Sequence, residues 1–260
     1  MNTAQTQRPL NVARVAAASA LLLLLFATVC VAAGRLPSNV AGVSLAFVAG
    51  LLVTPFVASP FEWLVHRYVY HRAAWVLRRI HTVHVAHHFL YFPTWRYVTG
   101  GPARRIPVLA RGVAVPQGSA LGNAATYLAH FGFYMTIGAL VIWLPAWRLS
   151  QSLPFLLGTL AGTAVISNLF ITVHDAIHRP GSHPLMESQG WFRFLDEHHY
   201  IHHVDTEANV NFLLPLADLL FGTLRTRLTA EELVRHGTRA AAKSRVVGRG
   251  EPAREALQTA

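Results

Sequence analysis

The chain has 260 residues, of which 53% are hydrophobic and only 13% are charged, and its formal net charge is +10. Soluble domains carry about 25% charged residues, so this composition indicates a protein embedded in a membrane. The single cysteine, Cys30, excludes an internal disulfide and any cysteine-rich zinc or iron–sulfur site. No nucleic-acid partner is expected from the positive charge, because the arginines fit a membrane topology better.

Four apolar stretches are long enough to cross a bilayer as helices. A helix rises about 1.5 Å per residue, so about 20 apolar residues span a hydrocarbon core of roughly 30 Å. A secretory signal peptide is the alternative for the first stretch, but its length and the three stretches that follow favour a span. The predicted spans are Val15–Gly34, Val40–Pro60, Ala120–Trp147 and Leu153–Val173.

The basic residues are distributed unevenly around these spans. Residues 61–120 and 174–260 hold most of them, whereas the two short loops near Arg35 and Arg148 have one each. The positive-inside rule then places both termini and both basic segments in the cytoplasm. The predicted fold class is therefore an all-α integral membrane protein, with four transmembrane helices and a cytoplasmic histidine-rich helical cap.

The expected organisation has three parts. They are a cytoplasmic N-terminal segment (residues 1–14), a four-span domain (residues 15–228) and a basic cytoplasmic tail (residues 229–260). Gly100–Ser119 is expected to be a loop, because it is rich in Gly, Pro and Arg. Residues 209–225 are predicted to form an amphipathic or interfacial stretch. The tail has few large apolar groups, which predicts a solvated helix and then disorder after about residue 240.

Two H-x-x-H-H triplets and two pairs contain ten of the 15 histidines. Positions i, i+3 and i+4 of a helix lie on one face, so the three imidazoles of each triplet should point the same way. His66 and His71 are five residues apart, a separation that turns about 140° on an α-helix, so a helix bend is expected there. Ten imidazoles are too many for one ion and suit two. The candidate metal ligands are His66, His71, His84, His87, His88, His174, His178, His199, His202 and His203.

Imidazole nitrogen suits iron, zinc, copper or nickel. Ten neutral histidines carry no negative charge, so hydroxide, oxide or nearby carboxylates would have to offset the charge of the ions. The acidic residues near the clusters are interpreted as partners of the histidines or as surface charges rather than as ligands. They are Glu62, Asp175, Asp196 and Asp205.

Five histidines lie outside the pattern. His81 precedes His84 by three residues, so its membership of that helix face stays open. The other four are interpreted as structural or exposed residues: His130, His183, His198 and His236.

Three histidine motifs resemble the histidine boxes of the fatty acid hydroxylase / sterol desaturase superfamily of membrane di-iron oxygenases. They are HRYVYH at 66–71, HVAHH at 84–88 and HYIHH at 199–203. HDAIH at 174–178 is similar to the additional pair that this family places before its last box, and PLADLLFGTLR at 215–225 resembles the segment after that box. The order of the boxes makes the resemblance specific.

The resemblance covers roughly residues 60–226, with two departures. The spacer between the first two boxes is shorter than in fatty acid 2-hydroxylases. The stretch from residue 178 to residue 199 is longer and carries Pro180, Gly181 and Pro184. Loops near the metals shape access to them, so the substrate stays open among fatty acyl chains, sphingolipids, sterols and carotenoids.

Membership would imply a cytoplasmic cap in which all ten candidate histidines bind two non-haem iron ions. The ions would use O2 and two electrons to hydroxylate, desaturate or cleave a lipid that enters from the bilayer. The sequence has no HPGG haem-binding motif. Electrons are therefore expected from an external NAD(P)H-linked donor, through a separate b-type cytochrome or a ferredoxin with its reductase. The composition, low in Lys and high in Ala and Arg, favours a bacterial inner membrane.

Other functions remain open beside a lipid hydroxylase. A lipid desaturase would use the same site. A metal transporter or sensor would need ionisable groups inside the spans, where His130 is the chief exception to their apolar character. A haem protein would pair histidines across helices inside the membrane. Aromatic residues near the boxes are candidates to line a lipid path or to pack the site: Phe89, Tyr91, Phe92, Trp95 and Phe212.

Overall fold

The computed structural model describes residues 10–73, 77–92, 94 and 119–234, and all regular secondary structure in these residues is helical. The predicted Gly100–Ser119 loop, apart from Ser119, lies outside the described residues, as do Trp95 and the tail from residue 235. In chain order the helices are α1 (Val12–Gly34), α2 (Val40–Val65), the π-helix η1 (His66–Tyr70), α3 (Arg78–Ala86), the π-helix η3 (His87–Tyr91), α5 (Ala120–Gly138), the π-helix η6 (Ala139–Trp143), α6 (Leu144–Ser150), α7 (Leu153–His178), α8 (Pro184–Glu187), α9 (Gly190–Val204) and α10 (Leu216–Phe221).

Four continuous helical stretches are long and apolar enough to cross a membrane, as predicted from the sequence. They are Val12–Gly34, Val40–Tyr70, Ala120–Ser150 and Leu153–His178. The second and fourth run beyond their predicted ends at Pro60 and Val173. Both helices continue past their apolar parts, and these extensions carry three of the candidate histidines. The three are His66, His174 and His178.

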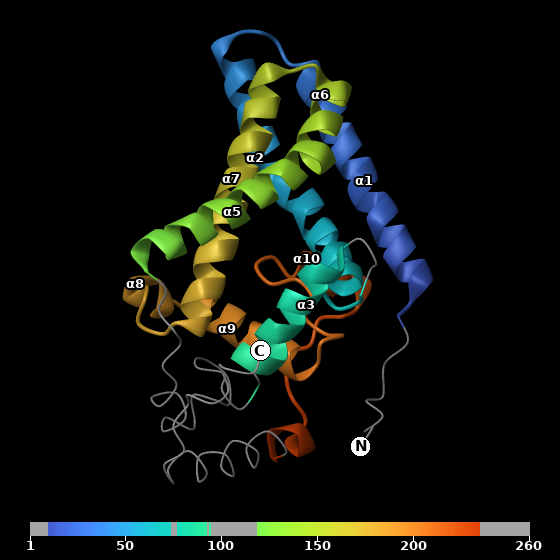
Figure 1. The fold of residues 1–260 in the computed structure, drawn as a ribbon. Helices are drawn as coiled ribbons and strands as arrows, with labels where there is room; N and C mark the ends of the chain where they lie inside the picture. The colour runs from blue at the N-terminus through green and yellow to red at the C-terminus, as the bar shows by residue number, and fades with distance from the viewer. Residues whose placement is uncertain (1–9, 74–76, 93, 95–118, 235–260) are drawn as a thin grey trace.

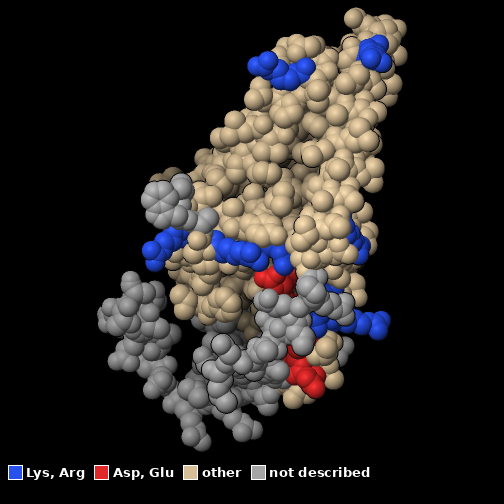
Figure 2. Space-filling model, turned by 90° about the vertical axis from the view of Figure 1, so that its right-hand side faces the viewer, with Lys and Arg blue, Asp and Glu red and all other residues tan. Residues whose placement is uncertain are grey.

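The long helices stand side by side, with their short connecting turns at one end and the remaining helices at the other (Figure 1). We call the second part the cap: it consists of α3, η3 and the chain from α8 to α10. Figure 2 shows Lys and Arg at the far end of the spans and in a band where the spans meet the cap. The surface between these two levels is uncharged on that face, as a membrane-crossing segment requires.

Helices α2 and α7 pack with their backbones in contact. A Cβ atom added to Gly158 would lie 2.0 Å from the carbonyl oxygen of Phe47, and one added to Gly50 would lie 2.3 Å from that of Phe155. Small residues allow such close approach between membrane helices, where packing rather than hydrophobic burial holds helices together. This contact fixes the position of the cap end of α2 relative to that of α7, and both ends carry candidate ligands.

The stretch predicted to be interfacial forms the core of the cap instead. Val210, Asn211 and Phe212 are buried in a loop before α10, and Asp218 is buried within α10. The polar members of this stretch, which suggested contact with water, make internal hydrogen bonds. The guanidinium of Arg14 in α1 donates to the carbonyl oxygens of Leu219 and Leu220, where α10 ends, and so ties the first span to the cap.

Gly158→Ala should destabilise the protein, because its new methyl group meets the backbone of α2 rather than a movable side chain. The expected loss is about 1–3 kcal/mol, typical of overpacking. Gly132→Ala is the matched control, since no atom lies within 4 Å of its added Cβ. Thermal unfolding of the purified variants in detergent would measure both. A Gly158→Ala midpoint equal to that of the wild type would contradict this account of the α2–α7 contact.

Candidate metal centre

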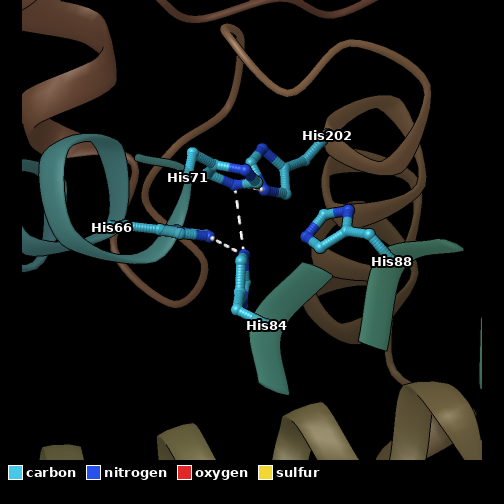
Figure 3. A group of neighbouring side chains, drawn as sticks. All are labelled: His66, His71, His84, His88 and His202. Atoms are coloured by element: carbon cyan, nitrogen blue, oxygen red, sulfur yellow. Dashed lines mark hydrogen bonds between the residues drawn. The ribbon is translucent and has the colours of Figure 1, made fainter. Parts of the chain in front are cut away.

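Nine of the ten candidate histidines come together in two groups at the cap end of the spans. Within each group the ligand atoms lie within 4.8 Å of one another. The first group combines residues from the end of α2, from α3 and η3, and from α9, and its rings point toward one centre (Figure 3). Its members are His66, His71, His84, His88 and His202. The second group consists of His87, His178, His199 and His203.

Each H-x-x-H-H triplet divides between the two groups. In the first triplet the i and i+4 residues, His84 and His88, join the first group, and His87 joins the second. In the last triplet the arrangement is reversed, and only the i+3 residue, His202, joins the first group. The three imidazoles of each triplet share one helix face, as predicted. They do not all point to one centre, because that face lies between the two groups.

The two triplets face each other, as a shared site requires. The rings of His88 and His203 stack with centroids 4.1 Å apart, and those of His87 and His203 are 5.0 Å apart. The two groups are therefore direct neighbours.

Two π-turns bring histidines into the groups. In η1 the amide of His71 donates to the carbonyl oxygen of His66 at 3.1 Å, the i+5 pattern of a π-helix. The rings of these two residues stack at 4.9 Å, so a widened turn takes the place of the expected bend. The corresponding bond in η3 joins Phe92 to His87. Such turns are frequent at functional sites, because they re-aim side chains within a helix.

The ring nitrogens of the first group have the spacing of ligands around one ion. The Nε2 atom of His84 lies 3.0 Å from that of His66 and 3.1 Å from that of His71, which is itself 3.1 Å from Nε2 of His202. Two nitrogens about 2.1 Å from one ion are about 3.0 Å apart at a right angle and about 3.4 Å apart at a tetrahedral angle. The spacing is therefore compatible with ligands around one ion.

Backbone carbonyls orient several of these rings. The Nδ1 atom of His202 faces the carbonyl oxygen of Ala208 at 2.8 Å, and that of His66 faces Val210. In the second group, Nδ1 of His203 lies 2.9 Å from the carbonyl oxygen of Phe92. A carbonyl oxygen can only accept, so each Nδ1 carries the proton. Each Nε2 then keeps its lone pair for the centre of its group, the arrangement found at metal-bound histidines.

Both groups contain buried ring nitrogens for which no hydrogen-bond partner is found among the described residues. They include Nε2 of His87 in the second group and both ring nitrogens of His88 in the first. A buried polar atom without a partner is costly, and a metal ion would satisfy the inward-facing nitrogens. The residues present therefore fit a metal ion in each group.

The imidazoles outside the spans are held in the neutral form. Burial lowers the pKa of His71 from 6.5 to about 2, with a further contribution from His202. Burial is also the largest cause of the lowered pKa of His84 and His199, followed by neighbouring imidazoles. Neutral imidazole is the form that binds metal, so protons compete weakly with an ion at these groups.

The nearby carboxylates are not in either group, in agreement with the sequence interpretation. Glu62 accepts a hydrogen bond from the amide of Phe212 at 2.6 Å. Asp175 pairs with Arg179, and Asp205 pairs with Arg225. The fourth, Asp196, is buried in α9.

His174 is the one candidate ligand outside both groups. Its ring lies beside the second group, 4.8 Å from that of His87 and 5.0 Å from that of His199. It also stacks on Phe170 and meets the edge of Phe212. The last turns of α7 thus place His178 within the second group and His174 one turn above it, toward the spans.

The other histidines serve different roles. His81 Nδ1 faces the carbonyl oxygen of Tyr70 at 2.8 Å, outside both groups. His198 is buried, and its Nε2 lies 2.7 Å from the carbonyl oxygen of Asn211. His130 and His183 are exposed, as interpreted from the sequence. His236 lies outside the described residues.

The aromatic candidates divide into two kinds. Phe92 stacks on His178 with centroids 3.9 Å apart, and Phe212 meets the ring of His199 edge-on at 4.9 Å. Phe89 and Tyr91 are exposed. Two aromatic rings therefore cover the second group.

Sequence reasoning missed the polar residues of the buried loop, chiefly Asn209, Asn211 and Asp218. They are almost fully buried. Asp218 accepts backbone amides of the loop, and the two asparagines bind backbone groups of other segments. The only signal was two asparagines and an aspartate within an otherwise apolar stretch, which was interpreted as interfacial.

Comparison with protein-family models, curated proteins and solved structures finds no match to this chain.

Metal-free protein should lose stability as the pH falls below 6.5. Unfolded imidazoles take up protons near pH 6.5, whereas the folded ones, with lowered pKa values, stay neutral. The unfolded state then binds more protons than the folded state. Each such imidazole therefore lowers the free energy of unfolding by about 1.4 kcal/mol for each pH unit below 6.5.

Thermal unfolding of chelator-treated protein at pH 7.5 and 5.5 would measure this dependence. The midpoint should be lower at pH 5.5, and replacing both His84 and His88 by Gln should reduce the difference. A midpoint that is equal or higher at pH 5.5 would contradict the neutral state of the groups.

Proposed function

We propose that the protein is a membrane-bound, non-haem di-iron oxygenase that hydroxylates a lipid with O2 and two electrons. The observation that carries the proposal is the pair of adjacent all-imidazole groups at the end of four membrane-crossing helices. Each group has inward-facing nitrogens that an ion would satisfy. The order of the histidine boxes along the chain supports the same function.

Three considerations favour iron as the metal: the type of ligand, the number of ligands and the chemistry that the reaction requires. Nitrogen ligands suit iron, zinc, copper and nickel, and no thiolate is present in either group. The first group offers five nitrogens, whereas structural zinc sites are four-coordinate. Two redox-active ions side by side supply the chemistry that an inert C–H bond requires, which no protein side chain can provide.

The chain's own part is to hold the ions and admit an alkyl chain. Phe92 and Phe212 cover the second group, and Phe170 of α7 packs edge-on against Phe212 with centroids 5.1 Å apart. Tyr134 of α5 in turn contacts Phe170. Aromatic side chains in mutual contact therefore extend from the spans to the second group, and an apolar chain arriving from the bilayer would meet an apolar surface there.

The second group is the better candidate for the reacting side. It offers four histidine nitrogens against five in the first group, so more of its coordination would remain for O2. Phe92 and Phe212 pack directly on rings of this group. The proposal includes a cytoplasmic cap in a bacterial inner membrane, with electrons from a separate NAD(P)H-linked b-type cytochrome or ferredoxin.

His87→Ala should abolish the activity and lower the iron content, because His87 belongs to the second group and has an unpartnered Nε2. Lipid extracts from cells that produce the wild type should contain a lipid heavier by one oxygen atom, which extracts from the variant lack. His183→Ala, which changes an exposed histidine, is the matched control and should retain the product.

The outcome of the lipid analysis also separates the alternatives. A product lighter by two hydrogen atoms would indicate a desaturase on the same site. Bound metal without any change in lipids would indicate a metal-handling protein. Full turnover by His87→Ala would contradict an essential role for this residue.

A further inference from the structure

Three backbone carbonyl groups of one loop face histidine rings. The carbonyl oxygen of Ala208 lies 2.8 Å from Nδ1 of His202, and that of Val210 accepts from Nδ1 of His66. The carbonyl oxygen of Asn211 lies 2.7 Å from Nε2 of His198. The segment Ala208–Asn211 thus contacts imidazoles on two different helices, and we call it the carbonyl loop.

The carbonyl loop has no regular secondary structure, so other bonds must hold its conformation. The carboxylate of Asp218 accepts the backbone amides of Val210 at 2.9 Å and Asn211 at 2.8 Å, one on each oxygen. The hydroxyl of Thr223 donates to the same carboxylate at 2.6 Å. Asp218 is fully buried, and charge-assisted bonds of this kind are the strong ones.

Side chains of the loop also join it to the two helices whose histidines it contacts. The amide of Asn211 donates to the carbonyl oxygen of Ser59 in α2 at 2.7 Å. The amide of Asn209 donates to the carbonyl oxygen of His198 in α9 at 3.1 Å. The loop therefore holds α2 and α9 in register at the level of His66 and His202.

Both of the candidate ligands that the carbonyl loop contacts belong to the first group. In the second group, His203 directs its Nδ1 to Phe92, which follows η3. The two groups are thus oriented by different parts of the chain. A change in the carbonyl loop should consequently act on one group and spare the other.

We propose that Asp218 is a positioning residue that, through the carbonyl loop, fixes the tautomer and orientation of His66 and His202 and so sets the metal affinity of the first group. The inference rests on the proposed function only in that it requires the groups to bind metal. Asp218 itself does not touch the ion. Its part is to keep two amides and two carbonyls in place behind the rings.

Asp218→Asn tests this role with little change in shape. An amide offers one acceptor oxygen, so its NH2 group would face one of the two backbone N–H groups that the carboxylate accepts. Loss of such support behind a metal ligand weakens metal binding about 10–100-fold. Titration of chelator-treated full-length protein with Co²⁺, followed by its optical spectrum, would measure the affinity.

Two background variants assign the effect to a group. His199→Ala disables the second group and His84→Ala disables the first, because each residue belongs to one group alone. Asp218→Asn should weaken Co²⁺ binding about 10–100-fold in the His199→Ala background and leave it unchanged in the His84→Ala background. Equal weakening in both backgrounds, or none in either, would overturn the inference.

Further variants keep the test independent of folding. Glu187→Gln replaces another carboxylate that accepts backbone amides, those of Gly181 and His183, and should leave Co²⁺ binding unchanged. Ser59→Ala removes hydroxyl bonds to Asn211 and Leu214 and should reproduce the selective weakening, so it decides the outcome if Asp218→Asn does not fold. Wild-type protein that binds no Co²⁺ would overturn the proposed function itself. Wild-type binding with an unaffected Asp218→Asn would overturn this inference alone.

Discussion

Inward-facing lone pairs of buried imidazoles are the constraint on which the structure depends. In the first group, carbonyl oxygens accept hydrogen bonds from the Nδ1–H groups of two rings, so the Nε2 atoms of those rings face the centre without a proton. Rings of the two groups meet directly, as in the stack of His88 on His203. Burial and mutual repulsion keep these groups neutral, and a metal ion could be held between their nitrogen lone pairs.

The membrane helices and the cap both contribute histidines to the two groups. Close contact between α2 and α7, through Gly50 and Gly158, fixes the two helix ends that bear His66 and His178. The cap adds α3, η3 and α9, whose triplets divide between the two groups. Rigid helices and π-turns thus place nitrogens from distant parts of the sequence about 3 Å apart.

The sequence predicts the features that a single local rule governs. Bilayer thickness sets the length of an apolar helix, so four spans are evident, and the H-x-x-H-H spacing identifies the ligand-bearing helix faces. Features that depend on tertiary contacts cannot be predicted by such local rules. The split of each triplet needs the position of the opposing helix, and the η1 turn that stacks His71 on His66 is set by packing. The acceptors of His66 and His202 are backbone carbonyls, which have no signature in the sequence.

The central claim is that imidazoles from separate helices bind a pair of adjacent iron ions. X-ray absorption at the iron edge of the purified protein tests it most directly. The account predicts a first shell of nitrogen and oxygen only, with outer-shell scattering from several imidazole rings and from a second iron nearby. A first shell containing sulfur, the scattering pattern of a porphyrin, or protein that retains no iron would contradict it.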